Sequence, residues 1–81
     1  MTVTVKLFAA AREMIGSDAV SLELPEAATI ADAKRILCQM FPQIAGLLSR
    51  SVVARNMDYA LNADVIAVGD ELAVIPPVSG G

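Results

Sequence analysis

The chain has 81 residues, a net charge of −3 and 56% hydrophobic residues. This predicts one small domain that either exposes an apolar patch to a protein partner or scatters single apolar residues over its surface. Dispersed Lys and Arg residues disfavour nucleic acid and anionic membranes as partners. One cysteine and no histidine exclude a disulfide framework, a zinc site and a Ser-His-Asp or Cys-His pair within the chain, so no metal site is expected. With no apolar run long enough to span a bilayer and no signal-peptide pattern, we expect a cytoplasmic protein.

The first two strands and a short helix are predicted from the N-terminal quarter. Thr2 to Phe8 alternates apolar and polar residues, which is typical of a half-buried strand. Ala9 to Ile15 changes to a helical spacing, and Gly16 suits the left-handed cap of a short helix. Asp18 to Leu24 alternates again and should pair antiparallel with the first strand. The residues expected to face inward are Val3, Val5, Leu7, Ala10 or Ala11, Met14, Ile15, Val20, Leu22 and Leu24.

One main helix is predicted from Thr29 to Met40. Thr29 and Asp32 have the spacing of a capping box, and Pro42 sets the end. Cys38 has no neighbouring base or second thiol, which favours a packing role over a reactive one. The apolar stripe of this helix consists of Ile30, Ala33, Ile36, Leu37, Met40 and Phe41.

The second half of the chain contains shorter elements. We predict a helical turn at 44–49, a strand at 51–55, a turn at 56–58, a brief strand at 59–61, an ambiguous segment at 63–68 and a turn at Gly69–Asp70. Glu71 to Ile75 forms the last strand. Its two faces are both apolar, so it is either central in the sheet or carries an outward patch.

This order of elements predicts an α+β fold. Two strands, a helix and further strands place the one main helix across one face of a mixed sheet, with the first and last strands adjacent. That arrangement is a ubiquitin-like β-grasp. We expect a β-grasp domain over residues 1–75 and an extended tail over 76–81.

The tail reads Pro76-Pro77-Val78-Ser79-Gly80-Gly81. Two prolines hold the backbone extended, and two glycines remove side chains next to the carboxylate. Fully extended, the segment could reach about 20 Å. A carboxylate on such a stalk can enter a narrow active site of another protein; the alternative interpretation is a frayed terminus with glycines of no functional meaning.

Three motifs together resemble the small subunit of molybdopterin synthase, the MoaD family. They are the pattern Phe-Ala-x-x-Arg-Glu-x-x-Gly from Phe8 to Gly16, the Gly-Asp-Glu turn at Gly69, and the Pro-Pro-Val-Ser-Gly-Gly end. The motifs stand in family order and the resemblance covers nearly the full chain. Two positions depart from the family pattern. Ile75 replaces a residue that is often aromatic, and Arg55 leaves the direction of its strand open.

The resemblance implies a sulfur carrier that binds no cofactor itself. A MoeB-like, E1-like enzyme would use ATP and magnesium to adenylate Gly81, and sulfur from a persulfide donor would convert it to a thiocarboxylate. The tail, including Ser79 and Gly80, would then insert into a large MoaE-like subunit. Sulfur would pass there to cyclic pyranopterin monophosphate and build the molybdopterin dithiolene. The family synthase is a heterotetramer, and the catalytic groups are expected on the large subunit. The expected docking contacts are Ile75, Pro76, Pro77 and Val78, together with Phe8, which could instead belong to the core.

Three alternatives stay open. A carrier of another pathway, such as a thiamine-type carrier, tends to be shorter and to lack the segment from Phe8 to Gly16. A ubiquitin-like modifier would join Gly81 to lysines of other proteins. A plain interaction domain would make no use of the tail.

Overall fold

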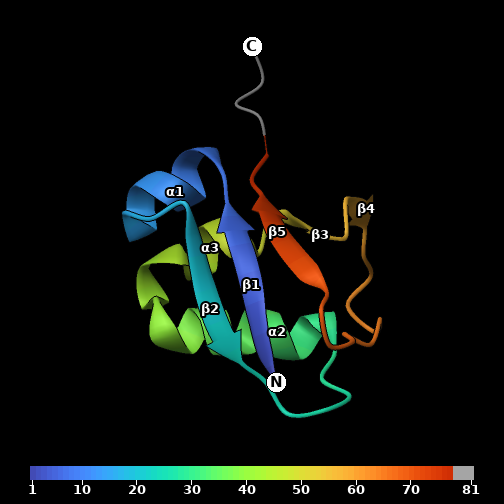
Figure 1. Ribbon diagram of the computed structural model, residues 1–81. Coiled ribbons are helices and arrows are strands. Elements are labelled where there is room, and N and C mark those ends of the chain that lie inside the picture. Colours follow the sequence, from blue (N-terminus) through green and yellow to red (C-terminus); the bar gives the residue numbers. More distant parts are fainter. Residues whose placement is uncertain (78–81) are drawn as a thin grey trace.

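The sheet is mixed and has the strand order β2-β1-β5-β3-β4 in the computed structural model, which describes residues 1–77 (Figure 1). Three helices and a 3-10 turn complete this part of the chain. The elements in chain order are β1 (Thr2–Leu7), α1 (Ala9–Ile15), β2 (Ala19–Glu23), α2 (Ile30–Met40), η1 (Pro42–Ile44), α3 (Ala45–Leu48), β3 (Val52–Arg55), β4 (Asp58–Tyr59) and β5 (Glu71–Ile75).

The strand pairing confirms the ubiquitin-like β-grasp. β1 is antiparallel to β2 and parallel to β5, with Thr4 opposite Glu71 and Leu7 opposite Val74. β3 is antiparallel to β5 on the other side. Because β1 and β5 run in the same direction, their C-terminal ends lie at the same end of the sheet. There α1 begins and the C-terminal segment leaves (Figure 1).

Helix α2 covers one face of the sheet and leaves the other face open (Figure 1). The predicted capping box starts it: the Asp32 N–H donates to Thr29 Oγ1 at 3.2 Å, and the Thr29 N–H donates to Asp32 Oδ2 at 2.9 Å. The core between helix and sheet is apolar. Its largest fully buried side chains are Leu7, Leu22, Ile30, Ile44, Ile66, Leu72, Val3, Val5 and Val74.

Two methionines expected inside are partly exposed. Met40 is 48% exposed because the chain turns after α2 into η1, and Phe41 and Ile44 pack against the core in its place. Met14 on α1 is also exposed, while Ala11 is the residue of that short helix that is fully buried. The expected small packing role of Cys38 is confirmed, since it is partly buried against the core.

The segment between β3 and β5 differs most from the expectation. The turn contains only Asn56 and Met57, so Asp58 begins β4 and the strand ends at Tyr59 rather than at residue 61. Residues 63–68, ambiguous in sequence, form a single bridge to the start of α2 and bury Ile66 in the core. Among the described residues, no helix is long and apolar enough to cross a membrane.

The direction of Arg55 is now defined. It pairs with Leu72, a core residue, so it lies on the α2 side of the sheet. Its Nη1 donates to the carbonyl oxygen of Val65 at 2.7 Å. Arg55, where the sequence departs from the family pattern, therefore links residues 63–68 to β3. Its side chain is not part of the open face.

Candidate functional site

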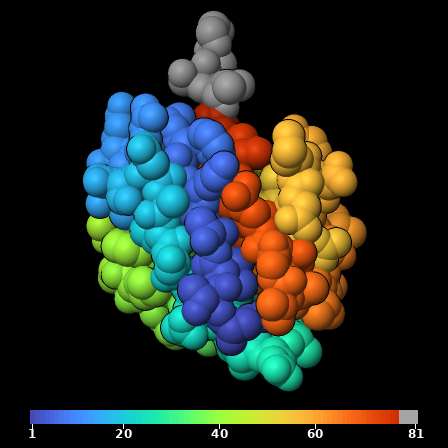
Figure 2. Space-filling model, viewed as in Figure 1, coloured from blue at the N-terminus to red at the C-terminus, as the bar shows by residue number. Residues whose placement is uncertain are grey.

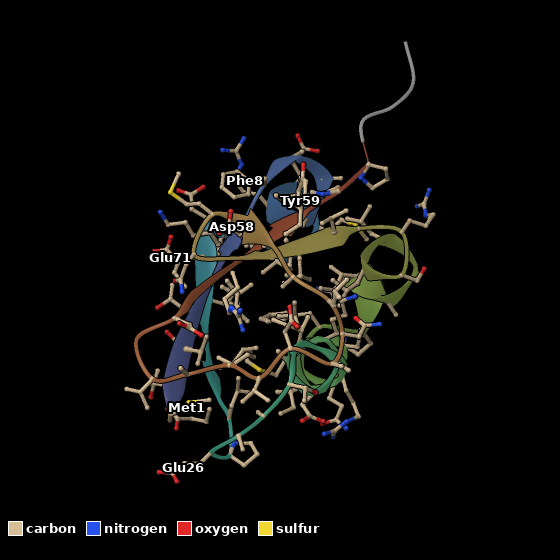
Figure 3. All side chains as sticks on the ribbon, turned by 90° about the vertical axis from the view of Figure 1, so that its right-hand side faces the viewer. Met1, Phe8, Glu26, Asp58, Tyr59 and Glu71 are labelled. Atoms are coloured by element: carbon tan, nitrogen blue, oxygen red, sulfur yellow. The ribbon has the colours of Figure 1, made fainter. Side chains whose placement is uncertain are left out.

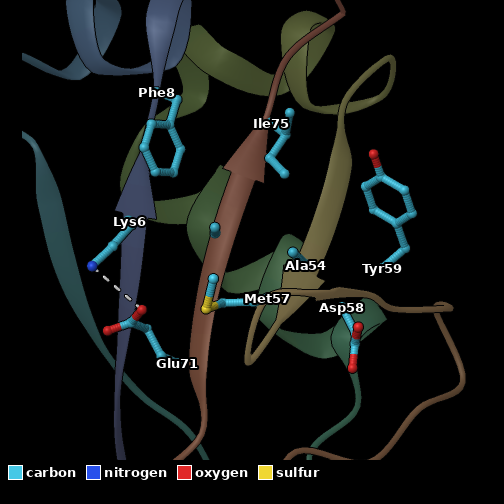
Figure 4. Close-up of a pocket in the computed structure, with 9 residues that line it drawn as sticks. Lys6, Phe8, Ala54, Met57, Asp58, Tyr59, Glu71 and Ile75 are labelled. Carbon is cyan, nitrogen blue, oxygen red and sulfur yellow. Dashed lines mark ion pairs between the residues drawn. The ribbon is translucent and has the colours of Figure 1, made fainter.

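An apolar depression of ≈580 Å³ lies on the open face of the sheet, close to the end from which the C-terminal segment leaves (Figures 2 and 4). We call it the sheet depression. It is lined by Lys6, Phe8, Ala54, Met57, Asp58, Tyr59, Glu71, Ala73 and Ile75. These residues come from β1, β5 and the β3–β4 hairpin, so the fold assembles the site from segments far apart in sequence.

Phe8 and Ile75 form the end of the depression nearest the tail. The parallel register that pairs Leu7 with Val74 brings the next residues, Phe8 and Ile75, beside each other (Figure 4). Phe8 is the N-cap of α1, and Ala9 follows with a positive φ of 49° that turns the chain into the helix. Phe8 stays 46% exposed and Ile75 37% exposed, so both present apolar surface to solvent.

Small residues form the floor and an aromatic residue forms one side. Ala54 pairs with Ala73 of β5 and with Tyr59 of β4, so all three side chains lie on the open face. The two alanines keep the floor low, and Tyr59 rises from the hairpin with 81% of its surface exposed. Tyr59 and Phe8 stand at the same end of the molecule, whereas Met1 and Glu26 stand at the opposite end (Figure 3).

Charged groups border the apolar centre. Lys6 Nζ lies 3.4 Å from Glu71 Oε1, and both side chains are about half exposed (Figure 4). A pair this exposed adds at most about 1 kcal/mol to stability. Asp58 also lines the depression on the hairpin side, although it pairs with Arg55, which lies on the α2 side of the sheet. The charged border on the open face is therefore the ion pair of Lys6 and Glu71.

The β3–β4 turn is clamped to the start of β5. The Asn56 N–H donates to the Glu71 carbonyl at 2.8 Å, and the Glu71 N–H donates to Asn56 Oδ1 at 3.0 Å. Asn56 Nδ2 also donates to Asp70 Oδ1 at 2.8 Å. Two hydrogen bonds hold the pKa of Asp70 below its ordinary value. The larger effect comes from the Ala67 N–H and the smaller one from the Asn56 side chain. The turn is thus fixed relative to the depression.

The structure brings together two of the predicted docking residues, Phe8 and Ile75. Pro76 is buried and Pro77 is exposed. Val78, Ser79, Gly80 and Gly81 lie outside the described residues, so their roles stay predictions.

Sequence reasoning missed the hairpin side of the depression. If the turn had been predicted as the two residues Asn56 and Met57, the register of the hairpin would have followed. That register places Tyr59 opposite Ala54 on the open face.

The described residues of this site offer a docking surface. No group of three His, Cys, Asp or Glu side chains within residues 1–77 is placed to hold a metal ion. The Lys6 ammonium is engaged by Glu71, and no histidine is present to move protons. The arrangement can bind another protein beside the exit of the tail.

Fold and site together define a small ubiquitin-like protein whose open sheet face carries an apolar depression next to its C-terminal segment. Residues 5–81 match the ThiS family. The chain is 40% identical over 78 residues to the molybdopterin synthase sulfur carrier subunit of Dictyostelium discoideum, covering 93% of this chain and 91% of that one. It therefore belongs to the ThiS/MoaD family, as the motifs predicted.

A second group of relatives carries a different name. The chain is 37% identical over 84 residues to small archaeal modifier protein 1 of Haloferax volcanii, covering 94% of this chain and 97% of that one. The crystal structure of that archaeal protein superposes with a TM-score of 0.90 at 34% identity, and the match covers all of both chains.

Proposed function

We propose that this chain is the sulfur carrier subunit of a molybdopterin synthase and that the carboxylate of Gly81 is the group it carries. The observation that supports this most strongly is the 40% identity over nearly the whole chain to a curated carrier subunit of that synthase. The family match runs through residue 81 and so includes the Gly-Gly end.

Loading follows from the chemistry of a carboxylate, which is a poor electrophile until it is activated. The Gly81 carboxylate attacks the α-phosphorus of ATP and releases pyrophosphate, which leaves a mixed anhydride with AMP. The terminal sulfur of a protein persulfide displaces AMP from the acyl carbon. A neighbouring thiol of the donor then breaks the S–S bond and closes a disulfide. The products are a thiocarboxylate on this chain and an oxidised donor.

Unloading takes place in the partner. The sheet depression docks on the large synthase subunit, and the tail carries the thiocarboxylate into its active site. The ionised sulfur attacks a carbon of the cyclic pyranopterin monophosphate, and the bond from that carbon to oxygen breaks. Water then hydrolyses the resulting thioester, which leaves the sulfur on the pterin and releases the carrier with a Gly81 carboxylate. A second loaded chain supplies the second sulfur of the dithiolene in the same way. Acid–base groups and phosphate contacts come from the large subunit, which agrees with a carrier that has no histidine. The assembly we propose contains two small and two large subunits.

Protein modification is the second candidate, and the similarity to small archaeal modifier protein 1 is the observation that favours it. In that reaction a lysine amine of a target protein attacks the activated Gly81, AMP leaves, and an isopeptide bond forms. Both functions begin with the same adenylate and differ only in the nucleophile that follows.

Reconstitution separates the two candidates. The purified chain is incubated with the adenylating enzyme, ATP, magnesium and a sulfur source, and then with the large synthase subunit of the same organism and the pterin precursor. We expect molybdopterin to form with the full chain and not with a chain that lacks Gly81. Normal product formation without Gly81, or no product with every component supplied, would contradict the proposal. Isopeptide-linked lysines in place of product would favour the modifier.

A further inference from the structure

Met57 occupies an unusual position in the β3–β4 hairpin. Asn56 and Met57 have positive φ values of 51° and 72°, as expected for the mirror-image turns that join two antiparallel strands. Glycine is the preferred residue at the second position of such a turn, because a side chain there is sterically strained. A methionine at this position is therefore a cost to the folded domain.

The folded domain gains little in return. The Met57 side chain is 95% exposed and is absent from the core and from the residues packed against it. Asn56, in contrast, offsets its own strain through hydrogen bonds to Asp70 and Glu71. Strain that does not improve packing is typical of positions held for binding.

The position of Met57 indicates what it contacts. It lines the sheet depression together with Ile75, Phe8 and Tyr59, and Figure 4 shows its thioether extending from the turn across β5 toward Glu71. The hydrogen bonds of Asn56 fix the turn, so the side chain is presented from a rigid base. Methionine and aromatic side chains are enriched at the centres of protein interfaces, and a thioether adapts to an irregular apolar recess.

The charges around Met57 indicate the chemistry of the opposing surface. Carboxylates stand at Asp58, Asp70 and Glu71, and the nearby ammonium of Lys6 is paired with Glu71. Arg55, on the same hairpin, lies on the other side of the sheet, but it pairs with Asp58 in the strand register and its charge helps to lower the pKa of Asp70. Three carboxylates against one ammonium and one guanidinium group leave the surroundings of Met57 with one net negative charge, which matches a surface that carries Lys or Arg.

We propose that Met57 is a specificity-determining anchor that inserts into an apolar recess bordered by Lys or Arg on the large synthase subunit. The inference rests on the proposed function. The large subunit is favoured as the occupant because Met57 lines the same sheet depression, beside the start of the tail, that the proposed function docks on that subunit.

Binding and stability should change in opposite directions when Met57 is replaced. Met57→Gly removes both the side chain and the strain. We expect its affinity for the large subunit, measured by titration calorimetry with the full-length chain, to fall about tenfold or more. Its midpoint of thermal unfolding should rise by about 4 °C. A residue with a purely structural role would not weaken binding while stabilising the fold.

Two further variants isolate the side chain. Met57→Gln keeps the length and the strain but adds polarity, and we expect weaker binding at unchanged thermal stability. Met40→Gln changes a methionine that is 48% exposed on α2, away from the open face, and should bind as the wild type does.

Each result decides one point. Wild-type affinity in both Met57 variants would overturn the inference while the proposed function stands. Weaker binding to the adenylating enzyme alone would overturn the assignment to the large subunit. If the wild-type chain does not bind the large subunit, the proposed function fails and the inference fails with it. If the glycine variant does not fold, Met57→Gln decides alone.

Discussion

The two faces of β5 contain apolar residues in equal measure but use them differently. Leu72 and Val74 point toward α2 and are buried in the core. Ala73 and Ile75 alternate with them, point to the open face and line the sheet depression. Burial against the helix accounts for the first pair. Within residues 1–77 no element covers the second pair as α2 covers the first, which leaves this face accessible for the docking that we propose.

This contrast separates stability from binding along a single strand. Substitutions on the inner face should change the free energy of unfolding, and substitutions on the open face should change affinity. The difference between the faces can be tested residue by residue, because neighbours in sequence belong to opposite faces.

The largest effect is expected on the inner face. Leu72→Ala removes a fully buried side chain and leaves a cavity, so the free energy of unfolding should fall by about 2–5 kcal/mol. Urea denaturation followed by circular dichroism measures this. A loss below about 1 kcal/mol would mean that the core around β5 is not closed as described.

A comparable effect, on binding alone, is expected on the open face. Ile75→Asp places a charge at the apolar end of the sheet depression and should weaken binding to the large synthase subunit about 100-fold, equivalent to about 2.7 kcal/mol. Stability should change by no more than about 1 kcal/mol. Ser21→Asp is the matched control: Ser21 is exposed on the same face, opposite Thr4, outside the depression. Equal effects of both changes would contradict the assignment.

The smallest effect concerns the cap of α2 and depends on pH. Hydrogen bonds lower the pKa of Asp32 below its ordinary value of 3.8. The largest effect comes from the Thr29 N–H, and the next comes from the Arg35 side chain. A carboxyl with a lowered pKa in the folded state stabilises above its unfolded pKa and loses that contribution as the pH falls through the folded pKa. Asp32→Asn should therefore be less stable than the wild type at pH 7, and the difference should shrink as the pH falls below 3.8 and through the lowered pKa of Asp32. Parallel stability curves from pH 7 to 2.5 would contradict this.

Local patterns in the sequence were enough to predict most of the fold. Alternation in β1 identified its inner face, Gly16 the cap of α1, and Thr29 with Asp32 the capping box that starts α2. In β5, where both faces are apolar, the sequence left the inner face open. Each of these signals depends on residues a few positions apart.

The features that escaped prediction depend on long-range contacts. Ile66 lies in an irregular segment, and only packing across the sheet reveals that it belongs to the core. The hairpin side of the depression depends on the register between β3 and β4, which one extra turn residue would have changed. Met57 and Tyr59 became candidate site residues only when that register was known.

The most direct test of the central claim is the intact mass of this chain after incubation with the adenylating enzyme, ATP, magnesium and a sulfur source. We expect a species heavier by the exchange of one oxygen for one sulfur, located by fragmentation at Gly81. This species should disappear when Gly81 is deleted. Only the unmodified mass, with every component supplied and active, would contradict the claim that the chain carries sulfur on its C-terminal glycine.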